Sequence, residues 1–178
     1  MPRKSSRVLL WITQGLGSGR MPLAPGTWGS LLGVSVFAGL LATGHLAAYS
    51  LGTAMLLAVS VPLCGRAESV LGTHDPASVV LDEIAAVPLC YLGWVVLESA
   101  GDGTLPPWTL FFQGSSLWLV ILGFVLFRLL DALKPPPINA VQRLPSGWGI
   151  VADDAIAGLL TGVLVGAARW MGIGAIGP

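Results

Sequence analysis

The sequence predicts an all-α fold: a polytopic membrane bundle of about five hydrophobic helices, with short helices at the membrane interface. Hydrophobic residues make up 54% of the 178-residue chain, charged residues make up only 10%, and the mean hydropathy is +0.79. Soluble domains typically carry about 25% charged residues. In addition, the 45 residues between Arg20 and Arg66 contain no charged side chain, which is room for two spans of about 20 residues each.

The apolar segments and the turns between them place the expected spans. Gly44-His45 supplies a turn within the long uncharged stretch, and Gly101-Asp102-Gly103 with Pro106-Pro107 separates two later segments. We expect spans at about residues 27–43, 46–64, 79–97, 108–127 and 154–173.

The first 20 residues are expected to form an interfacial N-terminal arm that stays on the protein. They carry four basic residues, three of them before residue 8, but the apolar run at 8–12 is too short for the core of a signal sequence and ends in a glycine-rich stretch. No change of composition marks a second domain, so residues 1–178 are expected to form a single domain. Cys64 and Cys90 lie in apolar runs without metal-site spacing, and we interpret them as buried packing residues.

Basic residues are distributed unevenly across the expected membrane. With five spans, eight of the nine Lys and Arg residues fall on the side of the N-terminal arm, and only Arg169 falls on the other side. The positive-inside rule makes the basic side cytoplasmic. Seven of the nine acidic residues share that side, so we expect the active site to face the cytoplasm. The formal net charge of zero gives no support for nucleic-acid binding.

Two adjacent pairs of acidic residues each begin an apolar run. Asp82-Glu83 and Asp153-Asp154 are both followed by fourteen uncharged residues. Carboxylates at a membrane segment are costly unless they are satisfied, and adjacent desolvated carboxylates repel each other. A bound divalent cation removes both problems. For the first pair, a solvated helix start is the alternative, because Asp75-Pro76 is typical of an N-cap and a first helical residue.

Among the acidic residues, Asp154 is the one whose orientation the sequence predicts most directly. It begins a four-residue spacing that continues with Gly158, Gly162 and Gly166. Such a face of small residues lets membrane helices approach closely, so Asp154 is predicted to point into the helix bundle. An acid buried in this way marks a functional site by default.

A further charged group closes the fourth span. Arg128, Asp131 and Lys134 precede three prolines, which end the helix at Lys134. Bases at a helix C-terminus also occur for structural reasons alone, but Asp131 has the wrong sign for that end. We therefore predict that Arg128 and Lys134 bind a substrate phosphate.

A glycine-rich loop precedes the first span and offers backbone N–H groups. Gly26 and Thr27 stand where a helix N-terminus would favour an anion, so we predict that they contribute to phosphate binding. The glycines match neither a Walker A motif nor a dinucleotide fingerprint, and a flexible loop is the alternative interpretation.

Carboxylates, bases and a phosphate-binding loop on one membrane face are the groups that metal-assisted phosphoryl transfer requires, and carboxylate oxygens suit Mg²⁺. Water attack assisted by Mg²⁺ is the preferred route, and an aspartyl-phosphate on Asp131 or Asp153 is the alternative. We predict the catalytic residues to be Asp131, Asp153 and Lys134. We predict the metal ligands to be Asp82, Glu83, Asp131, Asp153 and Asp154.

Several of these motifs occur in the same order in bacterial phosphatidylglycerophosphatase A. The chain resembles that family over roughly residues 13–166, through the APGTWGS block at 24–30, the acidic pair at 82–83, the basic and acidic stretch at 128–138 and the segment at 149–158. The resemblance implies an all-helical enzyme of the bacterial inner membrane. It also implies Mg²⁺-dependent hydrolysis of phosphatidylglycerophosphate to phosphatidylglycerol and phosphate.

The chain departs from the family pattern at a few positions, which leaves its substrate preference open. Ala86, Leu130 and Pro136 replace residues that the pattern favours, and residues 139–142 lack an expected acid. A phosphatase of another phospholipid monoester, such as phosphatidic acid, is therefore an alternative.

Two further classes of protein compete with a phosphatase: a small ion or metal transporter with an acid-lined site, and a non-catalytic membrane scaffold. A transporter site would lie near the membrane midplane, whereas these charged groups lie at one end of the spans. A scaffold has no need for acids on a packing face. Nothing in the sequence predicts an oligomeric state.

Overall fold

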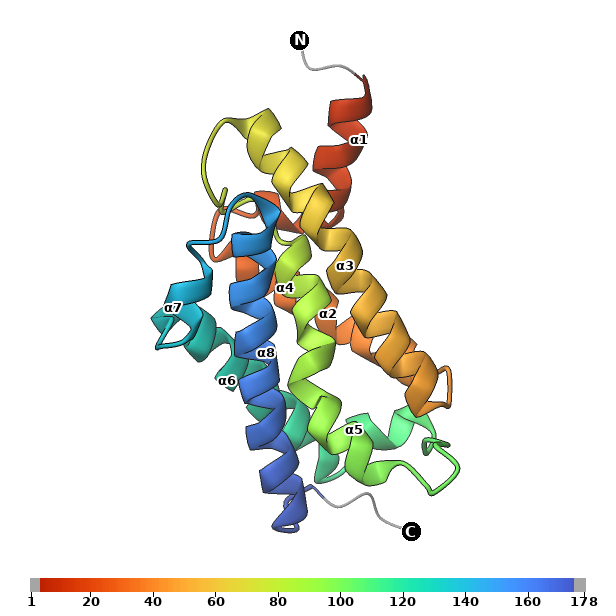
Figure 1. The fold of residues 1–178 in the computed structure, drawn as a ribbon. Coiled ribbons are helices and arrows are strands. Elements are labelled where there is room, and N and C mark those ends of the chain that lie inside the picture. Colours follow the sequence, from red (N-terminus) through yellow and green to blue (C-terminus); the bar gives the residue numbers. More distant parts are fainter. Residues whose placement is uncertain (1–3, 175–178) are drawn as a thin grey trace.

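The computed structural model describes residues 4–174, and this part of the chain folds into helices without a β-strand (Figure 1). The elements in chain order are α1 (Lys4–Thr13), η1 (Gly15–Arg20), α2 (Pro25–Leu41), α3 (Leu46–Leu71), α4 (Leu81–Ala86), η2 (Val87–Tyr91), α5 (Leu92–Glu98), η3 (Trp108–Phe112), α6 (Ser116–Leu133), α7 (Ile138–Val141) and α8 (Gly147–Trp170). The η elements are short 3₁₀ helices. The all-helical prediction is confirmed.

Helix α8 packs against α3, α5, α6 and η2. Its small-residue face makes this packing close. A Cβ atom added to Gly158 would lie 2.8 Å from the carbonyl oxygen of Ala86, and one added to Gly166 would lie 3.2 Å from the backbone of Gly93. Gly162 likewise meets the backbone of η2. The predicted packing face is therefore confirmed.

Three helices among the described residues are long and apolar enough to cross a membrane: α3, α6 and α8. Helix α2 is apolar but has only 17 residues. The expected third span is divided into α4, η2 and α5, and Pro88, which has no N–H to donate, lies near the start of the 3₁₀ turn. The count of about five spanning helices is not confirmed.

Two of the long helices have boundaries that differ from the prediction. Residues 108–112 form η3, and α6 begins only at Ser116 and continues to Leu133. Helix α8 begins at Gly147 instead of residue 154, so Asp153 and Asp154 lie in its second turn. A Cβ at Gly147 would lie 2.7 Å from the amide nitrogen of Gly65 in α3. The lack of a side chain at Gly147 lets α8 start directly against α3.

The predicted helix start at Pro76 is wrong. Residues 72–80 lie outside the helices, and Asp75 has a φ of +45°, which is unsuited to an N-cap. Val80 instead donates its backbone N–H to the carbonyl of Thr13 over 2.9 Å, and its side chain is fully buried. Because this segment is tied to the end of α1, the helix begins only at Leu81.

An aromatic core fixes η2 between its neighbours. Phe37 stacks on Tyr91 with 4.2 Å between ring centroids and meets Tyr49 edge-on. The Tyr49 hydroxyl donates to the Pro88 carbonyl over 2.6 Å, and the Tyr91 hydroxyl donates to the Val120 carbonyl over 2.9 Å. These buried hydroxyls are therefore satisfied, and the core holds α4, which continues directly into η2. Both cysteines are buried and free, as predicted.

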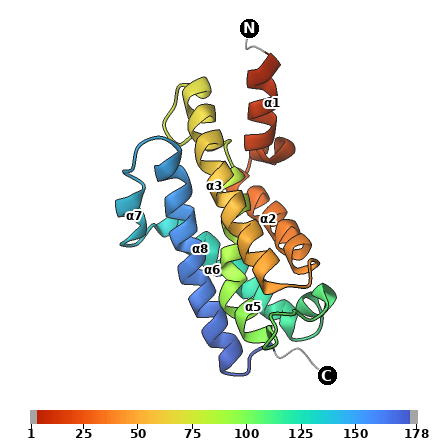
Figure 2. The same ribbon diagram turned by 45° about the vertical axis from the view of Figure 1, so that its right-hand side comes forward.

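The two ends of the bundle are well separated. Helix α1 and the C-terminal half of α3 lie at one end, and α5 and the C-terminal turn of α8 lie at the other (Figures 1 and 2). Helix α1 packs against α3 and keeps the apolar side chains of Val8 and Trp11 more than half exposed. This surface suits the interfacial arm, whose role stays a prediction.

Candidate active site

A cavity of about 360 Å³ opens where the N-termini of α2 and α4 and the C-terminus of α6 meet the second turn of α8. Its charged lining among the described residues consists of six carboxyl groups and two bases. The lining residues are Ala24, Pro25, Gly26, Asp75, Ala77, Val79, Asp82, Glu83, Arg128, Asp131, Ala132, Lys134, Ile150, Asp153 and Asp154. All the acids and bases predicted to form the site therefore share one cavity.

Three of the carboxylates form a tight cluster. Asp82, Glu83 and Asp154 each offer an oxygen, and these oxygens all lie within 4.8 Å of one another. Asp82 and Asp154 are only 5% and 3% exposed. Within the described part of the chain, Oδ1 of Asp82 and Oε2 of Glu83 are buried without a hydrogen-bond partner. Carboxylates this close and this dry repel one another, and unpaired buried oxygens are costly.

The local sequence explains how these acids come together. Asp82 and Glu83 occupy the first turn of α4, just before the segment that packs on α8. Gly158 lies against Ala86 near the end of α4. Because Asp154 is one helical turn before Gly158, this contact brings its carboxylate beside the α4 pair.

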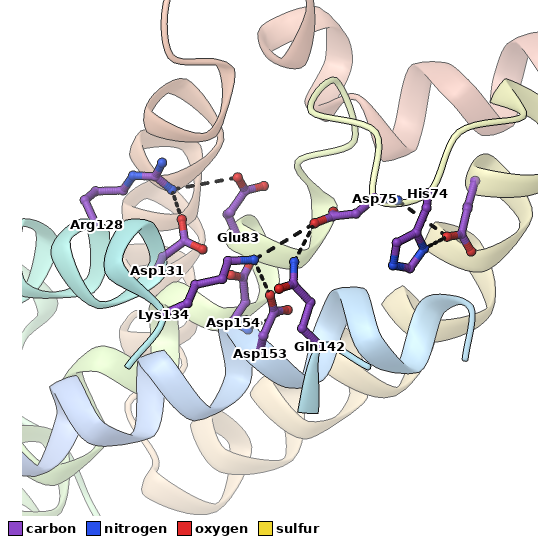
Figure 3. A network of polar contacts seen from close by, with 10 residues as sticks. His74, Asp75, Glu83, Arg128, Asp131, Lys134, Gln142, Asp153 and Asp154 are labelled. Atoms are coloured by element: carbon purple, nitrogen blue, oxygen red, sulfur yellow. Dashed lines mark hydrogen bonds and ion pairs between the residues drawn. The ribbon is translucent and has the colours of Figure 1, made fainter. Parts of the chain in front are cut away.

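Arg128 links the cluster to α6 and α2 (Figure 3). Its Nη1 atom lies 2.8 Å from Asp131 Oδ2 and 3.8 Å from Glu83 Oε1, and it donates to the Ser30 hydroxyl over 3.4 Å. A guanidinium has five N–H donors, so further donors are available to an oxyanion in the cavity. The side chain is 24% exposed, which keeps it accessible.

Gly26 gives the cavity room at the first turn of α2. A Cβ at this position would collide with Oε1 of Glu83 and would lie 3.0 Å from both terminal nitrogens of Arg128. Thr27 follows Gly26 but is not among the described residues that line the cavity. Gly26 therefore lines the cavity, and the phosphate-binding role of both Gly26 and Thr27 stays a prediction.

Lys134 forms the second basic group, directly after α6 (Figure 3). Its Nζ atom donates to Asp153 Oδ2 over 2.6 Å and lies 4.0 Å from Asp75 Oδ2. Burial lowers the pKa of Lys134, but the hydrogen bond to Asp153 and the surrounding carboxylates outweigh burial and hold the pKa above its ordinary value. Lys134 is therefore a cation at neutral pH. Oδ1 of Asp153 accepts the backbone N–H of Asp154 over 3.1 Å.

The five predicted metal ligands thus fall into two groups. Asp82, Glu83 and Asp154 form the cluster, whereas Asp131 and Asp153 are ion-paired with Arg128 and Lys134. The carboxyl groups of Asp131 and Asp154 are still close enough to interact. Direct metal ligation by Asp131 and Asp153 stays a prediction.

Sequence reasoning missed two residues beside the site. Asp75 precedes Pro76 in the manner of a helix cap, but it lines the cavity, and its Oδ2 accepts a hydrogen bond from Gln142 Nε2 over 3.1 Å (Figure 3). The scarcity of acids in this chain is a signal that could have indicated Asp75. Gln142 is neutral and follows the proline run, so no signal marks it. His74 is 66% exposed and pairs with Glu68 outside the cavity lining.

Comparison with known proteins shows the family of the chain. The family model of phosphatidylglycerophosphatase A matches residues 11–169. The chain belongs to this family of phosphoric monoester hydrolases.

Several curated relatives cover most of the chain. A phosphatidylglycerophosphatase A of Haemophilus influenzae is 34% identical over 88% of this chain and 86% of its own length. That of Escherichia coli is 36% identical over 83% of this chain and 75% of its own length. A Bacteroides thetaiotaomicron protein, provisionally named a phosphatidylinositol-3-phosphatase, is 31% identical over 95% of this chain and 98% of its own length. No solved structure matches the chain.

Proposed function

We propose that this protein hydrolyses phosphatidylglycerophosphate to phosphatidylglycerol and inorganic phosphate, with Mg²⁺ as its cofactor, at the cytoplasmic leaflet of the bacterial inner membrane. The observation that carries the proposal is the single cavity in which three close carboxylates stand beside two bases. Such a cavity suits a phosphate group with its counter-cation, and family membership supplies the lipid class.

The residues present fit a hard divalent cation. The cluster of Asp82, Glu83 and Asp154 consists of oxygen donors, and two of its buried oxygens lack a hydrogen-bond partner among the described residues. Oxygen donors are what Mg²⁺ prefers. When bound there, the cation would offset the negative charge of the phosphate as it reacts.

Two bases hold the phosphate. Arg128 presents its free N–H groups to the non-bridging oxygens, and Asp131 fixes the orientation of the guanidinium. Gly26 leaves the space beside Arg128 open, and the N-terminus of α2 adds a favourable dipole. Lys134, held by Asp153, stabilises the leaving glycerol oxygen and can donate a proton to it.

Asp131 is the better placed of the two catalytic carboxylates. Both oxygens of Asp153 are occupied, one by Lys134 and the other by the Asp154 amide. Asp131 uses one oxygen for Arg128. We assign Asp131 to the reacting oxygen: it accepts the proton of the attacking water as the new P–O bond forms and the P–O bond to glycerol breaks. Direct attack by Asp131, giving an aspartyl-phosphate, is the alternative.

The name of one relative indicates a second candidate substrate for this protein. The Bacteroides protein, provisionally named a phosphatidylinositol-3-phosphatase, matches nearly its whole length. Phosphatidylinositol 3-phosphate, phosphatidic acid and phosphatidylglycerophosphate share a phosphate monoester on a lipid, which is the group that the cavity binds.

Phosphate release by the purified protein tests this function. The protein in detergent micelles is given each of the three lipids, with Mg²⁺ or with a chelator. We expect the highest kcat/KM for phosphatidylglycerophosphate and no turnover after chelation. Faster release from either other lipid would reassign the substrate, and undiminished release in the chelator would remove the metal from the proposal.

The orientation has its own test. The basic end of the chain is proposed to face the cytoplasm. His74 is well exposed near the cavity end, so a His74→Cys variant lacking Cys64 and Cys90 should resist an impermeant thiol reagent in intact cells and react after lysis. Labelling from outside would reverse the orientation.

A further inference from the structure

An apolar furrow lies between α2 and α6, outside the cavity described above. It has a volume of about 200 Å³ and is lined by Leu31, Val34, Val120, Ile121 and Phe124. Every one of these side chains is apolar, and Leu31 and Ile121 remain 51% and 43% exposed.

Close packing of both helices on η2 creates the furrow. Gly33 of α2 lies against the side chain of Val87, and Gly123 of α6 lies against the ring of Tyr91. Each glycine lets its helix sit tightly on η2, which forms the layer beneath. The furrow runs along the outer side of this layer, in the apolar part of both helices.

The furrow lies along the same two helices that reach the candidate active site. Helix α2 begins at the cavity and α6 ends there, so the two chain directions are opposite. The body of each helix extends away from the cavity, α2 from Gly26 and α6 from Arg128. At about 1.5 Å per residue, Leu31 and Val34 lie roughly 8 and 12 Å beyond Gly26. Phe124 and Val120 lie roughly 6 and 12 Å beyond Arg128 by the same rise. Both walls therefore reach the same depth, about one to two turns below the cavity.

We infer that this furrow holds one acyl chain of the phospholipid substrate, so that the lipid enters sideways between α2 and α6 with its phosphate on Arg128. The inference rests on the proposed function and adds the path of the substrate. A lipid has an anionic head joined to an apolar chain, and here a base stands at the head of an apolar groove that is open on its outer side. Burial of the acyl chain in the furrow provides binding energy at a distance from the phosphate, and this energy helps to position the phosphate for reaction.

The test compares two substrates that carry the same head group. One is dioleoyl phosphatidylglycerophosphate, and the other is its water-soluble deacylated form. Leu31→Trp and Ile121→Trp fill the furrow, whereas Leu32→Trp and Val125→Trp place the same bulk at neighbouring exposed positions outside its lining. Phosphate release gives kcat/KM for each pair.

We expect the furrow variants to lower kcat/KM for the diacyl lipid by about tenfold or more relative to the deacylated form, since pocket shape discriminates at that scale. The control variants should keep the parental ratio. Phe124→Ala, which enlarges the furrow, should raise the relative rate for a methyl-branched chain.

Three results would overturn the inference: an unchanged ratio in both furrow variants, an equal change in the control variants, or no response of chain preference to Phe124→Ala. If these occur while the parent still hydrolyses the diacyl lipid, the acyl-chain path alone is wrong. If the parent releases no phosphate from the lipid, the proposed function fails as well.

Discussion

Both ends of the bundle carry charged side chains that are at least partly buried, but the local balance of acids and bases differs between them. At the end formed by α5 and the last turn of α8, Glu98 pairs with Arg169, and the Trp94 indole N–H donates to Glu98 over 3.0 Å. One acid meets one base, and the extra hydrogen bond satisfies the carboxylate. At the other end, six carboxyl groups line a cavity with two bases.

This difference distinguishes charged groups that only stabilise the fold from charged groups that suit a bound ligand. The Glu98–Arg169 pair is balanced in charge and hydrogen-bonded, so it joins α5 to α8 without needing a ligand. A surplus of acids that includes unpaired oxygens is costly by itself, and a bound cation would remove that cost. Predictions that separate the two ends therefore test the proposed function.

The largest effect is expected for Asp154→Asn. The amide keeps the shape of the side chain but cannot supply its charge to the cluster of Asp82, Glu83 and Asp154. We expect kcat for lipid hydrolysis to fall about 100- to 1,000-fold, the range for losing one electrostatic contact in an active site. Phosphate release at saturating lipid measures it. Turnover near that of the parent at ordinary Mg²⁺ concentrations would remove Asp154 from the site.

Arg128→Lys should have the next largest effect. Lysine keeps the positive charge but loses the planar fork that contacts Asp131 and a phosphate together. We expect kcat/KM to fall by roughly 10- to 100-fold, or about 1.4 to 2.7 kcal/mol. A Lys variant with parental kcat/KM would show that Arg128 acts only as a diffuse charge.

Gly26→Ala should lower activity by about tenfold, because the added methyl group displaces Glu83 or Arg128. Thr27→Val is the matched comparison at the next position, and we expect a smaller loss there because Thr27 does not line the described cavity. Steady-state kinetics of both variants decide the point. A larger loss for Thr27→Val would move the phosphate contact to the threonine hydroxyl.

The smallest effect on activity is expected at the opposite end of the bundle. Glu98→Gln leaves Arg169 without its counter-charge, so the free energy of unfolding should fall by about 1–3 kcal/mol. The midpoint of thermal unfolding should drop by roughly 2–4 °C per kcal/mol, while kcat stays within about twofold of the parent. A large loss of turnover without a change in melting would show that this end contributes to catalysis.

The sequence predicted the grouping of the charged residues better than it predicted the spans. Adjacent acids before apolar runs predicted that Asp82, Glu83 and Asp154 come together, because buried carboxylates that lack a counter-charge are costly. The glycine spacing after Asp154 also predicted its direction, since only one face of a helix can carry such a pattern. Both inferences depend on residues that are adjacent or a few positions apart in the sequence, so they can be made without knowing the tertiary contacts.

Features that depend on tertiary contacts escaped prediction. The backbone N–H of Val80 donates to the carbonyl of Thr13, which is distant in sequence, and this contact prevents the helix that Pro76 would favour. Hydropathy alone predicts one span over residues 79–97, but η2 packs on α8 as a 3₁₀ turn. Asp75 enters the cavity through the same irregular segment, so its role could not be predicted from helical spacing.

The most direct test of the central claim is the thermal melt of purified protein with and without Mg²⁺, comparing the parent with Asp82→Asn and Glu98→Gln. If the cluster is a cation site, Mg²⁺ should stabilise the parent by about 2.7 kcal/mol at one hundred times its Kd. Asp82→Asn should melt higher than the parent without metal, because one repelling charge is gone, and should lose the response to Mg²⁺. Glu98→Gln should melt lower and keep the full response. Equal Mg²⁺ responses in the parent and Asp82→Asn would contradict a cation site at this cluster.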